Sequence, residues 1–170
     1  MCALALSLAA MPTARASRRI AAPVDDLWSI VSDPYHLPRW WPRVERVEDV
    51  GADTFTEVMK TRAGKTVRAD FAVVLQEPGS GTVVWRQQLE GTPFAGVLSH
   101  SETELRVVAL DATEPRCEVT IELRQELGSR PSSSFGRMLN LPRLGGVLVR
   151  RAADATVEAA LDGLELIGGH

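Results

Sequence analysis

The stretch that decides the fold runs from Ile20 to Val50 and reads IAAPVDDLWSIVSDPYHLPRWWPRVERVEDV. Its pattern predicts a strand end, two short helices, an aromatic turn and the start of a second strand. Pro23 suits the first turn of a helix, and Asp25 and Asp26 follow it where the helix dipole favours negative charge. Apolar residues then recur at intervals of three and four on one helical face, at Val24, Leu27, Trp28 and Val31.

The first helix should end at Asp33. Pro34 follows and disfavours the helical conformation at the residue before it. The Asp33 side chain can then cap the second short helix.

Two adjacent tryptophans, Trp40 and Trp41, lie between Pro38 and Pro42. Only 5% of the chain is aromatic. Two indoles held between prolines therefore indicate a packed or ligand-facing surface. We expect Trp40 to border a ligand cavity and Trp28 to belong to the fixed core.

Length and charge limit the classes of protein. A chain of 170 residues suits one domain with a sizeable core. The net charge is −3, with 24% charged residues of both signs, which leaves no basic field for nucleic acid. No run is long and apolar enough to predict a transmembrane segment.

The N-terminal residues admit two interpretations. Cys2 to Met11 are small and apolar, and Ala14-Arg15-Ala16 resembles a signal-peptide cleavage site. No positive charge precedes this run, and cleavage would remove most of the expected first strand, Thr13 to Ile20. We therefore predict a cytoplasmic protein, with export as the alternative. Residues 1–12 are expected to be an extension, either disordered or a mis-assigned start ahead of Met11, and residues 13–170 a single domain.

Metal and cofactor signatures are missing from the sequence. Cys2 and Cys117 lie far apart without ligand spacing, so we expect no disulfide and a reducing compartment. His36 and His100 have no suitably spaced partners, so no metal is expected. No nucleophile motif, phosphate loop or dinucleotide fingerprint appears, and no cofactor is predicted.

Beyond Pro42 the period of the sequence changes to two. Apolar and polar residues alternate in runs separated by Gly, Pro and Asp, which predicts six meandering antiparallel strands. One predicted face contains Phe71, Val73 and Leu75, and the clearest run has Cys117, Val119, Ile121 and Leu123 on one side.

A long amphipathic helix is predicted from Arg143 to Ile167. Its apolar residues are Leu144, Val147, Leu148, Ala155, Ala159 and Leu161. We expect Leu148 to pack against the sheet. Acidic residues in the last turns oppose the helix dipole, so the segment from Glu165 to Gly169 is expected to fray.

These elements predict an α+β fold in which a curved antiparallel sheet of about seven strands wraps on the C-terminal helix. The two short helices follow the first strand. Because a single helix covers the apolar face of the sheet, the space between them should stay partly hollow and could hold an apolar ligand.

The sequence resembles the START-like (SRPBCC) superfamily, which includes polyketide cyclases and dehydrases, lipid-transport proteins and coenzyme Q binding proteins. The likeness covers Ala14 to Gly168. The resemblance implies a helix-grip fold with a deep apolar cavity. It rests on Ile20-Ala21-Ala22-Pro23, Leu27-Trp28, Asp33-Pro34, Leu37-Pro38, Trp40, Pro42, Gly91-Thr92-Pro93-Phe94 and the strand from Cys117. Cyclase members carry an aromatic and acidic segment after Trp-Pro. Here Arg43, Val44 and Glu45 follow Trp41-Pro42, and this difference disfavours a cyclase.

Candidate ligand-binding residues come from the aromatic turn, the strand faces and the helix. The aromatic and methionine candidates could equally be plain core, and the polar ones could be solvated at the ends of elements. The set is Tyr35, Trp40, Trp41, Phe55, Glu57, Met59, Phe71, Trp85, Gln87, Phe94 and Leu148.

Three functional hypotheses follow. The first is a module that binds a small hydrophobic or aromatic molecule, such as a lipid, quinone or polyketide, without changing it. The second is a cyclase or dehydratase in which Tyr35, Gln87 or Glu57 steers an enol and moves a proton. The third is a partner-binding protein with a vestigial cavity. A homodimer is possible in each case.

Overall fold

The computed structural model describes residues 14–61, 63–128 and 142–168, with side chains in the last range from residue 146 onward. The predicted extension 1–12 lies outside these residues. The elements are β1 (Ala14–Ile20), α1 (Val24–Val31), the 3-10 helix η1 (Pro34–His36), α2 (Leu37–Trp40), β2 (Val44–Glu48), β3 (Thr54–Lys60), β4 (Thr66–Glu77), β5 (Thr82–Gln88), the 3-10 helix η2 (Pro93–Gly96), β6 (Leu98–Ala109), β7 (Cys117–Leu127) and α4 (Pro142–Gly168).

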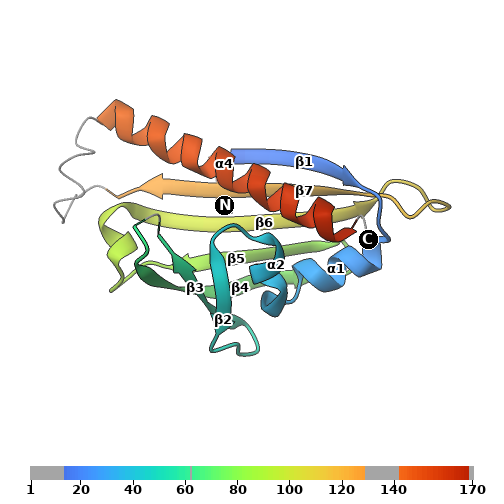
Figure 1. The fold of residues 1–170 in the computed structure, drawn as a ribbon, viewed down its shortest axis with the longest axis horizontal. Coiled ribbons are helices and arrows are strands. Elements are labelled where there is room, and N and C mark those ends of the chain that lie inside the picture. The colour runs from blue at the N-terminus through green and yellow to red at the C-terminus, as the bar shows by residue number, and fades with distance from the viewer. Residues whose placement is uncertain (1–13, 62, 129–141, 169–170) are drawn as a thin grey trace, which may run out of the picture.

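Within the described residues the strands form one seven-stranded antiparallel sheet, in the order β1-β7-β6-β5-β4-β3-β2. Strands β2 to β7 form a meander, and β1 joins it at the edge beside β7, with Ile20 opposite Cys117. Helix α4 lies across one face of the sheet (Figure 1). The predicted α+β helix-grip fold is confirmed.

Irregularities in strand pairing bend the sheet. The register shifts between Val73 and Leu75 in β4, and similar shifts occur in β2 and β6. Such a bulge turns the following side chain away from its expected face. Leu75 is consequently 44% exposed, so the prediction that it shares a buried face with Phe71 and Val73 is wrong.

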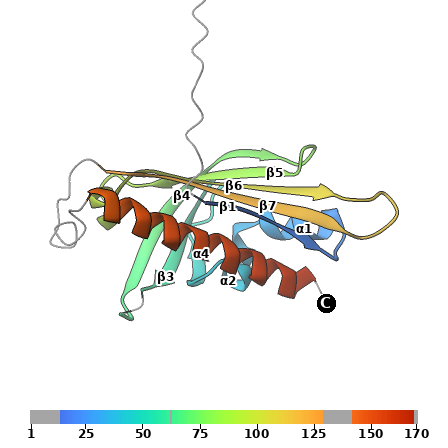
Figure 2. The same ribbon diagram turned by 90° about the horizontal axis from the view of Figure 1, so that it is seen from above.

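Helix α4 packs against β1, β7 and α2, on the same side of the sheet as α2 (Figure 2). Gly163 allows the close approach to α2. A Cβ atom at this position would lie 2.5 Å from the carbonyl oxygen of Trp40. The helix can therefore reach α2 only because residue 163 has no side chain.

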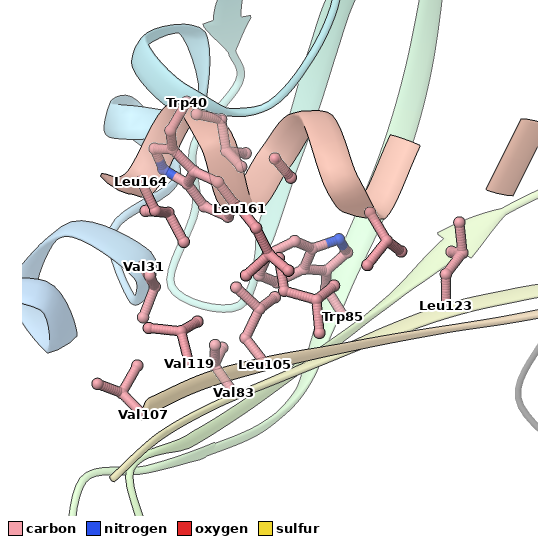
Figure 3. Packing of buried hydrophobic residues seen from close by; sticks show 14 of the residues in the cluster. Val31, Trp40, Val83, Trp85, Leu105, Val107, Val119, Leu123, Leu161 and Leu164 are labelled. Atoms are coloured by element: carbon pink, nitrogen blue, oxygen red, sulfur yellow. The ribbon is translucent and has the colours of Figure 1, made fainter. Parts of the chain in front are cut away.

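The core lies where α1, α2 and the C-terminal half of α4 meet β5 to β7 (Figure 3). Leu161 and Leu164 of α4 are fully buried there. The packed side chains include Val31, Trp40, Val83, Leu105, Val107, Val119, Leu161 and Leu164.

The buried face of α4 differs from the predicted one. Leu148 is 50% exposed, whereas Val157 and Leu161 are buried. Nine residues separate Leu148 from Val157, which at about 100° per residue is about half a turn, so the two side chains point in opposite directions. The expectation that Leu148 packs on the sheet is wrong.

The segment from Glu165 was expected to fray. The structure shows that α4 stays helical up to Gly168, so this expectation is wrong for the described residues. Arg18 of β1 supplies the missing positive charge. Its guanidinium lies 2.9 Å from Glu158, 2.5 Å from Asp162 and 2.9 Å from Glu165. A cation from another element thus offsets the acidic residues at the helix end.

No helix in the described part of the chain is long and apolar enough to cross a membrane.

Candidate functional site

A pocket of about 430 Å³ lies between the sheet and α4, beyond the close-packed core. The sheet contributes side chains from β3 to β7, the aromatic turn contributes its rim, and α4 contributes one face. The lining residues are Trp41, Pro42, Arg43, Glu57, Met59, Phe71, Trp85, Gln87, Phe94, Leu98, Ser101, Thr103, Leu123, Gln125, Ala152, Ala153, Ala155, Thr156 and Ala159.

Among the described residues, the helix side of the pocket carries only small side chains. Alanine and threonine line it at Ala152, Ala153, Ala155, Thr156 and Ala159. In the next turns of the same helix, Leu161 and Leu164 fill the space down to the sheet. The change in side-chain size along α4 is therefore what leaves the pocket open.

Aromatic rings form much of the opposite wall. Trp41 and Trp85 meet edge to face, with ring centroids 5.9 Å apart. Phe71 also lines the pocket and stacks on Phe55, its partner on the neighbouring strand β3, at a centroid distance of 5.2 Å. Edge-to-face and offset-stacked rings are favourable arrangements. The wall is thus a set of rings held by one another, and it presents flat apolar surface to a ligand.

Polar side chains lie beside this wall on the same face of the sheet. Gln87 of β5 is opposite Phe71 of β4, and Ser101 of β6 is opposite Gln125 of β7. Gln125 Nε2 donates a hydrogen bond to Ser101 Oγ at 3.4 Å. Thr103 is two residues from Ser101 and faces the same way, because side chains alternate along a strand. All these groups are uncharged.

Glu57 is the most unusual residue of the pocket. It lies on β3 and is 1% exposed. In the part of the chain that the structure describes, its Oε1 has no hydrogen-bond partner. Burial raises the pKa of Glu57 from its ordinary value near 4.5 to about 8. At neutral pH this side chain is mainly a neutral carboxylic acid.

Arg43 stands at the exposed rim and is the only other ionisable residue among the described residues that line the pocket. Its φ of 68° is in the left-handed region, which is uncommon for a side chain other than glycine. No ion pair between Arg43 and Glu57 occurs within 4.0 Å in the described residues. Among the described residues, no cation pairs with the buried acid, and burial is the cause of its raised pKa.

A second pocket of about 590 Å³ adjoins the first. It is lined mainly by η2 and the start of β6, together with Val67, Val149 and Ala152. Phe94, Leu98, Gln125 and Ala152 line both pockets. The two spaces therefore meet at these shared side chains.

The structure brings together most of the predicted ligand-binding residues. Those that line the first pocket are Trp41, Glu57, Met59, Phe71, Trp85, Gln87 and Phe94. Their contact with a ligand stays a prediction.

Four predicted residues lie elsewhere. Tyr35 is 63% exposed on η1, and Leu148 is exposed at the start of α4. Phe55 is buried beside Phe71 and outside the lining of the first pocket. Trp40 is 3% exposed and packs in the core, and its Nε1 has no hydrogen-bond partner among the described residues.

The structure places Trp40, which was expected to border the cavity, in the core, and leaves Trp28, which was expected to be fixed core, only partly buried. Trp28 is only partly buried and packs at the edge of the core cluster. Trp40 lies under α4, because Gly163 lets the helix backbone approach it closely. Its neighbour Trp41 takes the place at the pocket that was predicted for Trp40.

Sequence reasoning missed several lining residues. Thr103 carried a signal, since it is a polar residue on the apolar face of its strand, as Gln87 is. Ser101 and Gln125 carried a weaker form of the same signal. The alanines of α4 carried no signal by themselves, because alanine is a normal residue throughout a helix.

His36 and His100 each lie near a carboxylate, away from the pocket lining. His36 Nε2 lies 3.8 Å from Asp33, and His100 Nε2 lies 3.9 Å from Glu102. Asp33 Oδ1 accepts a hydrogen bond from the backbone N–H of Tyr35, which confirms its predicted capping role. Among the described residues, no group of three or more His, Cys, Asp or Glu side chains could hold a metal ion.

A family profile described as polyketide cyclase/dehydrase and lipid transport matches residues 11–166. No protein among curated sequences matches the chain. The family description covers both catalysis and transport, and the match by itself does not choose between them.

Solved structures share the fold at low sequence identity. A di-domain aromatase/cyclase, BexL from the BE-7585A biosynthetic pathway, is 18% identical with a TM-score of 0.67, over 89% of this chain and 44% of its own. A protein from Thermus thermophilus is 22% identical, with a TM-score of 0.61, over 89% and 93% of the two chains. A START superfamily protein from Mycobacterium smegmatis is 15% identical, with a TM-score of 0.54, over 85% and 95%. This chain thus spans less than half of the di-domain protein, and these likenesses concern the fold.

Proposed function

Because this chain belongs to the polyketide cyclase/dehydrase and lipid transport family, we propose that it binds a small hydrophobic or aromatic molecule between its sheet and α4. The ligand would be of lipid, quinone or polyketide type. The observation that carries the proposal is the pocket of about 430 Å³ walled by Trp41, Phe71, Trp85 and Phe94. Its volume lies within the range of about 300–1,000 Å³ that is usual for small-molecule sites.

The chemistry of the lining supports a flat and mainly apolar ligand. Rings offer large contact areas, and each neutral polar group nearby can fix one orientation of a bound molecule. The alanines of α4 leave room for the ligand where larger residues would fill the space. The adjoining pocket at η2 could take an apolar extension of the same molecule.

The test is titration of Nile red, a neutral apolar dye, into wild type and two leucine variants of α4. Ala152→Leu fills the pocket, and Asp154→Leu adds the same side chain at an exposed position outside it. We expect Ala152→Leu to weaken binding at least about tenfold with little change in the melting temperature, and Asp154→Leu to bind like wild type. Equal affinities for all three proteins would contradict the proposal. Native mass spectrometry of freshly purified protein would then show whether a small molecule co-purifies, and its mass.

A second candidate function is proton-transfer catalysis of the cyclase or dehydratase kind. The specific observation in its favour is Glu57, a desolvated acid with an unpartnered oxygen and a pKa near neutrality. General acids and bases work best when their pKa lies close to the operating pH. Of the other two residues predicted for this role, Gln87 lines the pocket, whereas Tyr35 is exposed and outside the lining.

Nitrobenzisoxazole offers a simple test of this candidate. A base removes its ring C–H proton, the N–O bond breaks, and the coloured nitrile phenolate forms. If the Glu57 carboxylate is the base, the rate should rise with pH through about 8 and be lost in Glu57→Gln. Equal rates for wild type and Glu57→Gln would remove the support for catalysis while leaving ligand binding unaffected.

A further inference from the structure

We propose that Glu57 acts as an uncharged hydrogen-bond donor that selects neutral ligands with an acceptor oxygen, such as a ketone or quinone carbonyl, and rejects carboxylates. This inference rests on the proposed binding function. Beyond the binding function, it states that Glu57 determines which ligands bind and that these ligands are uncharged.

The carboxyl group of Glu57 lies at the wall of the pocket. Glu57 lines the pocket and is buried, and its Oε1 has no hydrogen-bond partner among the described residues. A buried polar group without a partner costs about 1–3 kcal/mol, which a bound molecule can recover by completing the hydrogen bond. The unpaired oxygen therefore indicates where a polar atom of the ligand belongs.

The charged residues on the strands and the helix around Glu57 have other partners or are exposed. On the neighbouring strands, charged side chains pair with one another instead of with Glu57. Arg68 of β4 pairs with Glu48 and Asp49, and Asp70 accepts a hydrogen bond from Thr56. Other charged residues of β2, β3 and β5 also form ion pairs with one another: Arg46 with Glu48, Lys60 with Glu45, and Arg86 with Glu102 of β6. On α4, the charged residues Arg150, Arg151, Asp154 and Glu158 are exposed.

The consequence concerns the protonation state of Glu57. No described residue places a cation beside it, and desolvation raises its pKa to about 8. The acid keeps its proton at neutral pH and can donate a hydrogen bond to an acceptor oxygen of the ligand. Among the described residues that line the pocket, a ligand carboxylate would find no buried cation to balance it, since Arg43 is at the exposed rim.

The polar groups beside Glu57 on the sheet side of the pocket are uncharged. Gln87, Ser101, Thr103 and Gln125 offer amide and hydroxyl groups and no charge. Amides and hydroxyls can satisfy carbonyl and hydroxyl oxygens of a ligand, but they do not offset a full charge in an apolar site. Among the described lining residues, the buried polar groups beside Glu57 are thus uncharged, and Arg43 is exposed at the rim.

The experiment compares four naphthalene probes of similar shape: methyl naphthyl ketone, ethylnaphthalene, naphthoate and naphthylethylamine. Affinities are measured by quenching of tryptophan fluorescence at about pH 6 and about pH 9.5. We expect the ketone to bind about tenfold more tightly than ethylnaphthalene at the lower pH, because it gains one hydrogen bond. Naphthoate should bind more weakly than both. At the higher pH, where Glu57 is ionised, the advantage of the ketone should disappear.

Variants separate the role of Glu57 from general effects. Glu57→Gln keeps a donor and loses the titration, so its preference for the ketone should persist at both pH values. Glu57→Met should bind the ketone and ethylnaphthalene equally. Glu45→Gln makes the same chemical change at an exposed residue of β2 outside the pocket and should behave like wild type.

Different results overturn different statements. If ethylnaphthalene binds wild type as tightly as the ketone, or the amine binds most tightly at about pH 6, the donor role of Glu57 is wrong although the pocket binds ligands. If none of the four probes binds, the proposed function itself is wrong. Because the pH comparison uses wild type alone, poor folding of a variant would not obscure the outcome.

Discussion

The two halves of the interface between α4 and the sheet differ in how completely they are filled. Toward the C-terminal end, Leu161 and Leu164 reach the sheet and close the space with Trp40 (Figure 3). Toward the N-terminal end, Ala152 and Ala159 leave a pocket of about 430 Å³. The same helix and the same sheet form both halves. Side-chain size along one helix therefore determines which half is core and which is site. We call the half around Leu161 and Leu164 the closed half and the half around the pocket the open half.

Trp40→Ala should have the largest effect, because it opens a cavity in the closed half. Removing a buried tryptophan costs about 3–5 kcal/mol of unfolding free energy. Trp28→Ala, at the edge of the core, should cost clearly less. Urea unfolding of both variants would measure this difference. A larger loss for Trp28→Ala would show that the closed half is centred on α1 rather than on α4.

Glu57 distinguishes the open half by its pH dependence. The unfolded chain ionises Glu57 near 4.5 and the folded chain near 8, so the folded state holds an extra proton between these values. The free energy of unfolding should therefore fall as pH rises through this window and level off above it. The fall from about pH 5 to about pH 9 is at most about 4 kcal/mol.

Glu57→Gln should remove this fall, while Glu45→Gln should keep it. The measurement is the urea unfolding free energy of the three proteins at a series of pH values. Parallel profiles for wild type and Glu57→Gln would mean that Glu57 is hydrated or paired in solution.

The smallest effect is expected for Leu148→Asp. Leu148 is half exposed and points away from the buried face of α4, so its replacement should change the unfolding free energy by no more than about 0.5 kcal/mol. Leu161→Asp is the matched comparison, since it puts an unpaired charge in the closed half and should destabilise severely. A strong effect of Leu148→Asp in thermal melts would show that the N-terminal turns of α4 are also covered.

Local signals in the sequence predicted the elements well. Asp33 before Pro34 predicted a cap, which the hydrogen bond from Tyr35 confirms. Period-two alternation predicted the strand that begins at Cys117. The pairing of β1 with β7 joins residues about a hundred positions apart, and no local pattern in the sequence predicted it.

The placement of individual side chains was harder to predict. Trp40 and Trp41 are adjacent and share a proline-bounded turn, so composition could not tell which indole turns into the core. Contact with Gly163, a distant residue, decides it. Leu148 was misplaced because the phase of a long helix depends on its packing. Glu57 and Gln87 were found because a polar residue on an apolar face requires an explanation.

The most direct test of the account is a crystal structure of the protein with methyl naphthyl ketone bound. The account predicts the ring system between Trp85 and the alanines of α4, with its carbonyl oxygen at hydrogen-bond distance from Glu57 and the closed half unchanged. A ketone bound outside this pocket, or an open half filled by the protein's own side chains, would contradict it.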